Sequence, residues 1–130
     1  MPLSSSWNWS NIYTNIVYGI RYAEGTFNEF GYYNTDTGVF TEMTKFDQYR
    51  NCNIGRGEGR MSNDDQFIVL SCRNSEGRLE LVSFSLSENA IVATIDAHDA
   101  YDWATVTPSG RYILVRNNIG ESRQLLRYSR

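Results

Sequence analysis

The sequence predicts an all-β fold in which one kind of sheet is repeated along the chain. Hydrophobic residues make up 41% of the 130 residues and aromatic residues 14%, with two prolines, a composition that favours strands around a packed core. A polar turn followed by an apolar run, residues 61–70, recurs 45 residues later at 106–115 and, more loosely, 52 residues earlier at 9–18. A period of about 40–50 residues with short strands indicates a row of similar sheets.

The first repeat supplies a short apolar strand and two further strands joined by a turn. Residues 16–18 are predicted to be its second strand, and Phe30 and Tyr32 belong to its third. Residues 35–38 form a turn of small and polar residues, and 39–43 form the fourth strand. The offset of 52 residues to the next repeat holds through this fourth strand, so the two segments are expected to fold alike.

The second repeat is the most complete, and its four strands are predicted at 60–62, 67–70, 82–86 and 91–95. The run 67–70 is apolar without alternation, which is typical of a strand buried on both faces. The third repeat has strands at 103–106, 112–115 and 125–128, and then the sequence stops before a fourth. Its turn, 107–110, has Pro second and Gly fourth, as a type I turn prefers. Asp65 stands where Gly110 does and is expected to adopt a left-handed conformation.

The turn Thr107-Pro108-Ser109-Gly110, with the Arg-Tyr and apolar run that follow it, resembles the "SPDG" turn of TolB-like and WD40-like β-propeller repeats. Residues 33–38 resemble the turn between the third and fourth strands of such blades. The resemblance covers residues 7–128. It implies one domain of three four-stranded antiparallel blades, at about 7–44, 58–95 and 102–128, the last lacking its outer strand.

Three blades are too few to close a ring, because propellers close with about 4–8. The sheets at either end would each leave an apolar face open. We therefore expect the fold to be completed by missing chain or by homo-oligomerisation, with a six-bladed dimer favoured through the end blades. Residues 1–6 of a partner are expected to lie along the open edge of the third blade.

Charge and hydropathy restrict the partners and the location. A net charge of −3 leaves no broad basic surface for nucleic acid, and no apolar run is long enough for a membrane span. The first residues lack a signal peptide, which predicts a cytoplasmic protein as the sequence is written. That inference lapses if the chain is part of a longer protein.

Cys52 and Cys72 leave the redox state open. Cys72 ends an apolar strand, where free buried thiols are common. A disulfide is conceivable, but the predicted strand pairing places Cys72 nearer to Gly57 than to Cys52. Without further Cys or a nearby His, the pair does not indicate a zinc site.

Chain direction gathers the longer predicted loops on one rim, where recognition is expected. These loops are 19–28, 45–60, 73–78, 96–102 and 116–123. The candidate binding residues on this rim are Asp47, Arg50, Asn51, Arg73, His98, Asp99, Tyr101, Asp102 and Asn117.

Each motif on this rim has a structural alternative. His98 could be a metal ligand or general base beside Asp99, or a solvated loop histidine. The spacing of Asp99 and Asp102 matches no calcium loop. The glycine-rich stretch 53–60 lacks the ending of a phosphate-binding loop, and Gly59 aligns with Ala104 at the crowded axis. We predict no catalytic residue, metal or cofactor.

The sequence therefore favours a non-catalytic binding or scaffold module that recognises a protein or small ligand through this rim. One alternative is a fragment of a propeller enzyme, such as a sugar-active lyase or hydrolase. Another is a truncated or mobile reading frame without a settled role.

Overall fold

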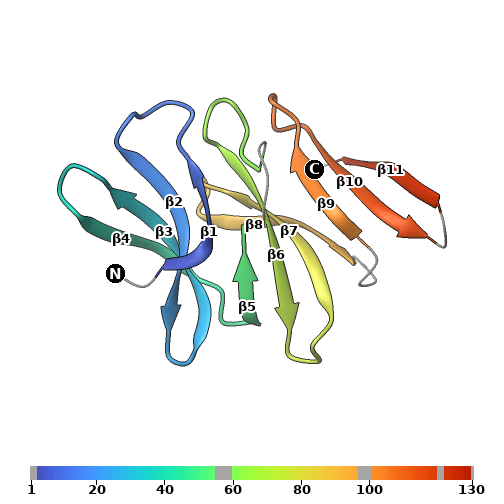
Figure 1. The fold of residues 1–130 in the computed structure, drawn as a ribbon, viewed down its shortest axis with the longest axis horizontal. Helices are drawn as coiled ribbons and strands as arrows, with labels where there is room; N and C mark the ends of the chain where they lie inside the picture. Colours follow the sequence, from blue (N-terminus) through green and yellow to red (C-terminus); the bar gives the residue numbers. More distant parts are fainter. Residues whose placement is uncertain (1–2, 55–59, 97–100, 120–121, 130) are drawn as a thin grey trace.

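The computed structural model describes residues 3–54, 60–96, 101–119 and 122–129 (Figure 1). Within these residues the regular structure is entirely β, arranged in three antiparallel sheets that follow one another from blue to red across the figure. The predicted fold class is confirmed. None of the described residues form a helix that could cross a membrane.

The sheets are meanders, in which each strand pairs with the next strand along the chain. The first sheet contains β1 (Leu3–Trp9), β2 (Ile16–Ala23), β3 (Thr26–Asn34) and β4 (Val39–Lys45). The second contains β5 (Tyr49–Asn53), β6 (Phe67–Asn74), β7 (Leu79–Ser85) and β8 (Ala90–Asp96). The third contains β9 (Tyr101–Val106), β10 (Tyr112–Ile119) and β11 (Ser122–Ser129). Among the described residues no fourth strand extends this last sheet, as the sequence predicted.

The middle sheet is buried on both faces, because it packs against the first sheet on one side and the third sheet on the other. Successive side chains of each of its strands point to opposite faces and so enter different cores. In β6, Ile68 and Leu70 belong to the core shared with the first sheet. Val69, between them, belongs to the core shared with the third sheet, where it meets Ile113 and Val115. Two hydrophobic cores thus join three sheets in a row.

Aromatic rings dominate the core between the first and second sheets. Phe84 of β7 lies with its ring centroid 5.2 Å from Phe30 of β3 and 5.4 Å from Phe46, in edge-to-face geometries that aromatic pairs prefer. Tyr18 stacks on Phe30 at 6.2 Å. The second core, which contains Val69, Leu81, Ala104, Val106, Ile113 and Val115, is aliphatic.

The polar turns of the second and third repeats have the same hydrogen bonds. The amide of Asp65 donates to the carbonyl of Ser62 (3.1 Å), and that of Gly110 donates to the carbonyl of Thr107 (2.7 Å). Asp65 has φ 58° and Gly110 has φ 76°, so the left-handed conformation predicted for Asp65 is confirmed. A Cβ on Gly110 would lie 2.5 Å from the ring of Phe67, which gives this glycine a second reason to be there.

The first strand of the second sheet lies earlier than predicted. The sequence placed it at 60–62, but the structure places it at Tyr49–Asn53, and Met61 returns as an isolated bridge to Ile68. Cys52 pairs with Cys72, and Met61 pairs with Ile68. The two pairs are nine residues apart on the first strand but four apart on β6, so the first strand contains an insertion of five residues. Because of this insertion the repeat period did not indicate a strand at 49–53, and these residues were predicted to lie in the loop 45–60.

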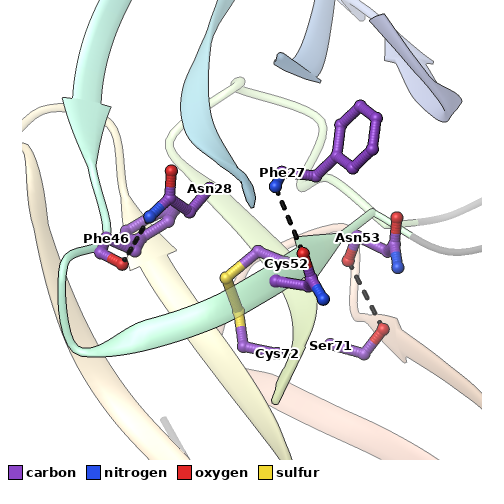
Figure 2. The surroundings of a disulfide bond; sticks show 8 residues. Phe27, Asn28, Phe46, Cys52, Asn53, Ser71 and Cys72 are labelled. Carbon is purple, nitrogen blue, oxygen red and sulfur yellow. Dashed lines mark hydrogen bonds between the residues drawn. A yellow bond between two sulfur atoms is a disulfide. The ribbon is translucent and has the colours of Figure 1, made fainter. Parts of the chain in front are cut away.

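The same shift corrects the expectation for the cysteines. Cys52 pairs directly with Cys72 in the β5–β6 register, not Gly57, and the two sulfurs form a disulfide (Figure 2). Their Cα atoms are 4.1 Å apart, and both residues are completely buried in the aromatic core.

Two of the predicted long loops are hairpins. β2 and β3 continue to Ala23 and Thr26, with Glu24 and Gly25 at positive φ between them. β10 and β11 stay paired to Ile119 and Ser122. Polar residues in these segments remain in paired strands, which composition alone does not distinguish from loops.

The N-terminal segment also differs from expectation. Residues 1–6 were predicted to pair with the third blade of a partner, whereas Leu3–Trp9 pairs with β2 of its own chain, Trp7 opposite Gly19 and Trp9 opposite Val17. This strand supplies the free edge of the first sheet.

Candidate functional site

The rim predicted to carry recognition contains a polar pocket at the ends of β5 and β6. Its volume is about 450 Å³, and its lining consists of Phe27, Asn51, Asn53, Ser71, Arg73 and Leu79. Asn51 and Arg73 are directly opposite each other in the antiparallel pair. Two of the predicted binding residues therefore lie in one pocket.

Hydrogen bonds fix the side chains of this pocket. The Asn51 side-chain oxygen accepts from the amide of Phe27 (3.2 Å), which ties the second sheet to the first. The Arg73 guanidinium donates to the carbonyl of Gly77 in the neighbouring turn (2.8 Å). The hydroxyl of Ser71 donates to the carbonyl of Asn53 (3.4 Å; Figure 2). Amides, a hydroxyl and one guanidinium suit a polar or anionic group rather than an apolar ligand.

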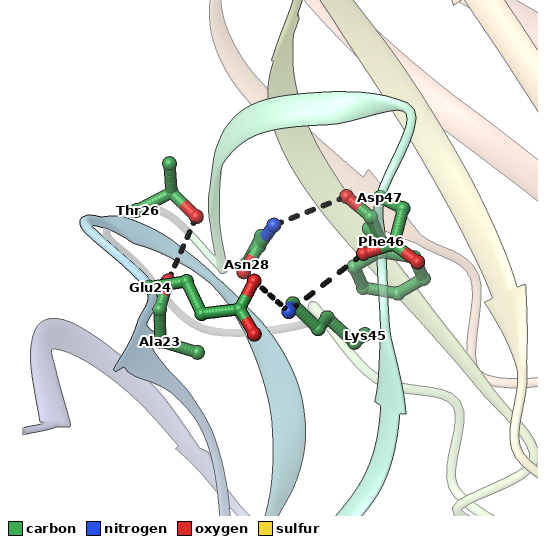
Figure 3. A network of polar contacts seen from close by, with 7 residues as sticks. All are labelled: Ala23, Glu24, Thr26, Asn28, Lys45, Phe46 and Asp47. Atoms are coloured by element: carbon green, nitrogen blue, oxygen red, sulfur yellow. Dashed lines mark hydrogen bonds and ion pairs between the residues drawn. The ribbon is translucent and has the colours of Figure 1, made fainter.

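Asp47 belongs to a charged cluster on the connection from the first to the second sheet (Figure 3). The Lys45 ammonium is 2.6 Å from Glu24 and 3.9 Å from Asp47. The hydrogen bond from Lys45 lowers the pKa of Glu24, and the same bond raises the pKa of Lys45. These groups are exposed, so the cluster shapes the surface potential more than it stabilises the fold. Arg50 is exposed on β5 between the cluster and the pocket.

The remaining predicted residues come from the third sheet and the segment before it. His98 and Asp99 lie outside the described residues. Tyr101 and Asn117 are backbone partners in the β9–β10 ladder, and Asp102 follows Tyr101, but their side chains lie outside the part of the chain that the structure describes. The structure therefore brings Asn51 and Arg73 together in the pocket, places Asp47 in the charged cluster and Arg50 exposed on β5, and leaves the other five as predictions. In the described residues no three His, Cys, Asp or Glu side chains gather in a way that could hold a metal ion.

A larger cleft, which the sequence did not predict, lies at the opposite rim, between the first and third sheets. Its volume is about 580 Å³. The lining residues are Trp7, Asn8, Trp9, Asn11, Met61, Asn63, Thr105, Val106, Thr107, Pro108 and Leu114. They come from β1, from β9 and β10, and from the turns of all three repeats. β1 and β9, the first strands of the first and third sheets, therefore face each other across this space. The alternation of Trp7 and Trp9 on an edge strand was the signal available in the sequence.

Asp65 joins the turns that border this cleft. Its carboxylate accepts hydrogen bonds from the Ser10 hydroxyl, from the amide of Asn11 (2.9 Å) and from the Tyr18 hydroxyl (3.3 Å). The carboxylate is buried with the rest of the residue, which is 4% exposed. Burial, and secondarily the negative charge of Asp65, raises the pKa of Tyr18 above its ordinary value. The turns of the second and third repeats are linked by a hydrogen bond from the amide of Asn63 to the carbonyl of Pro108 (2.9 Å).

Comparison with solved structures identifies this arrangement as a set of β-propeller blades. The chain is similar over 98% of its length to TolB from Acinetobacter baumannii, with a TM-score of 0.64 and 19% sequence identity. It spans about 30% of that protein's length. A chain of a mitotic checkpoint complex is similar over 86% of this chain and 30% of its own, with a TM-score of 0.48 and 13% identity.

The similarity to TolB establishes the fold and confirms the resemblance to β-propeller repeats that the turns indicate. No protein-family model and no curated protein matches the sequence.

Proposed function

We propose that this chain is a non-catalytic binding and scaffold module of the β-propeller type, whose ring is completed by blades beyond these three. The observation that carries the proposal is the contrast between the sheets. The middle sheet is buried on both faces, whereas each end sheet has one packed face and one open face.

A second copy of the chain is the occupant that the open faces favour. In the β3–β4 register Glu42 is opposite Gly31, and Phe40 is opposite Tyr33. Phe40 and Glu42 therefore lie on the open face of the first sheet, where the Arg21 guanidinium is 4.2 Å from the centroid of the Phe40 ring. On the third sheet, Leu114 is opposite Arg127, and its neighbours Ile113 and Val115 point into the core. Arg127 is therefore on the open face, 4.6 Å from the Tyr112 ring.

The two open faces thus differ in charge in a complementary sense. Glu42 is exposed on one and Arg127 on the other. Two copies arranged about a two-fold axis would place each first sheet against the third sheet of the partner and give six blades, a number within the usual range for closed rings. Each ring would then contain this contact between the copies twice.

The rim pocket is the proposed recognition surface of this module. Asn51 and Arg73 would receive a polar or anionic group of a protein or small ligand, with Asp47 and Arg50 beside them. This rim lies away from the open faces, so assembly of the ring would leave it accessible. Loops and strand ends on a rigid scaffold are where propeller-like folds present binding residues.

A charge exchange tests the assembly. Glu42→Lys and Arg127→Glu are each expected to weaken self-association, because like charges then face each other across the contact. The double variant restores the opposite pairing and is expected to recover most of the lost association. Glu88→Lys, an equal charge change on an exposed turn of the middle sheet, serves as the control.

The readout is sedimentation equilibrium of the parent and the four variants at equal concentrations. Recovery in the double variant supports contact between the first and third sheets of different copies. Association that is unaffected by either single change contradicts the proposed contact.

A further inference from the structure

We propose that the cleft between the first and third sheets binds a neutral carbohydrate. This inference rests on the proposed function only in that further blades would enclose the cleft. The cleft itself is formed by residues of one chain, and its volume of about 580 Å³ lies within the range of small-molecule sites.

The first argument is the pair of indoles. Trp7 and Trp9 are two residues apart on β1, so their side chains lie on the same side of the strand, and both line the cleft while being about half exposed. A pyranose ring presents a face of C–H groups, which packs on the negative face of an aromatic ring. Two indoles in line offer stacking surfaces for successive sugar units.

The second argument is the polar lining. Asn11 and Asn63 contribute carboxamides, and Thr105 and Thr107 contribute hydroxyls. Each of these groups can donate and accept, which matches sugar hydroxyls, since those also do both. The Asn11 side chain already donates to the carbonyl of Ser62 (2.9 Å), so it is held in place at the wall of the cleft.

The third argument is the absence of charge. Among the described residues that line the cleft, none is Asp, Glu, Lys, Arg or His. A charged ligand would lose water without gaining an ionic partner. A purely apolar ligand would desolvate the carboxamides without satisfying them. A neutral, polyhydroxylated ligand with apolar ring faces meets neither penalty.

The cleft also has rigid walls. Asp65 binds the Ser10–Asn11 turn, and Asn63 binds Pro108 through its backbone amide, so the three turns around the opening are linked by hydrogen bonds. A preorganised site loses less entropy on binding.

The test is a titration of the full chain with neutral hexasaccharides, cellohexaose, chitohexaose and maltohexaose, and with a uronic-acid hexamer as the charged counterpart. Calorimetry and tryptophan fluorescence report binding. We expect at least one neutral hexasaccharide to bind with a Kd below about 1 mM, and the charged hexamer not to bind.

Variants locate the site. Trp9→Ala is expected to weaken binding by about tenfold, because buried aromatic anchors dominate such contacts. Tyr22→Ala, which removes an exposed aromatic residue at the other end of β2, is the matched control and should bind normally. Asn63→Ala is expected to weaken binding about fivefold through a lost hydrogen bond. It alters an exposed turn side chain, so it remains informative if the Trp9 variant fails to fold.

Absence of binding by every neutral hexasaccharide overturns the inference. So does binding that survives both Trp7→Ala and Trp9→Ala, or a Trp9→Ala variant that changes the solution mass but not the sugar affinity. Solution mass is measured for the same samples. Sugar binding by a chain that stays monomeric would leave this inference standing and contradict the proposed assembly.

Discussion

Asp65 is the residue on which the junction between the first two sheets depends most. It combines a left-handed backbone conformation with a buried carboxylate that accepts from Ser10, Asn11 and Tyr18. The equivalent position in the third repeat is Gly110, which meets the conformational need without a side chain. The two positions therefore share a backbone conformation and differ in the carboxylate, through which Asp65 binds the first sheet.

Replacing Asp65 separates these two roles. Asp65→Gly keeps the backbone conformation but removes the acceptor, and we expect a loss of about 3 kcal/mol in the free energy of unfolding, since hydrogen bonds to charged groups contribute about 1.5–3 kcal/mol each. Urea unfolding followed by circular dichroism measures it. Glu24→Gly, at another non-glycine residue with positive φ, is exposed and should change stability much less. Equal effects of the two changes would show that the carboxylate is unimportant.

Two buried tyrosines predict sensitivity to alkali. Burial, and then Asp65, raises the pKa of Tyr18, while burial, and then a hydrogen bond with Glu80, raises the pKa of Tyr49. The folded protein therefore keeps protons that unfolded tyrosine releases near its ordinary pKa of 10.0. Stability should be complete below that pH and fall as the pH rises above it.

The alkaline loss can be assigned by substitution. Tyr18→Phe should lower stability by about 1 kcal/mol at pH 7 through its lost hydrogen bond. It should also flatten the fall in melting temperature as the pH rises above about 10, the ordinary tyrosine pKa. Tyr22→Phe, at an exposed site, should reproduce the parent curve. A parent protein whose stability is level through this range would contradict the account.

At this scale the sequence predicts conformation better than partners. The backbone of Asp65 could be predicted because its turn aligns with that of Gly110. Its hydrogen-bond partners could not, because Ser10, Asn11 and Tyr18 come from another sheet, 47–55 residues away.

Among the elements, β5 shows how the second sheet is held together. It is short, and its ladder with β6 is interrupted before Met61. The Cys52–Cys72 disulfide fastens it to β6 inside the aromatic core. The cytoplasmic location expected from the N-terminal sequence is not tested by this bond and stays a prediction.

Removal of the bond should lower stability through the unfolded state. The loop it closes has a sequence separation of 20, for which loop entropy alone corresponds to about 3 kcal/mol. The double variant Cys52→Ser/Cys72→Ser should lose at least that amount in urea unfolding, and reduction of the parent should have a similar effect. Thiol titration of the unfolded, unreduced parent should find no free cysteine. A free thiol there would contradict the pairing.

Strand identity could be read from hydrophobic pattern in most of the molecule, but strand length could not. β2, β6 and β10 each continue for several residues beyond the apolar runs that predict them, because polar residues such as Arg21 and Arg73 remain in the ladder. β5 was missed for a different reason. The repeat period places a strand at Met61, and an insertion moves most of the pairing upstream.

For the whole molecule, the row of three sheets explains both the predicted and the unpredicted sites. The rim pocket at Asn51 and Arg73 lies where chain direction gathers strand ends, so part of it could be predicted. The cleft at Trp7 and Trp9 depends on how the first and third sheets approach each other, a distance that no local pattern encodes. Both follow from sheets that pack face to face and leave the outer faces open.

The solution mass of the parent chain at several concentrations tests this account most directly. Light scattering should show a species of twice the 15.0 kDa of one chain that dissociates on dilution or in the Glu42→Lys variant. A stable monomer at every concentration would contradict the claim that the open faces require a partner.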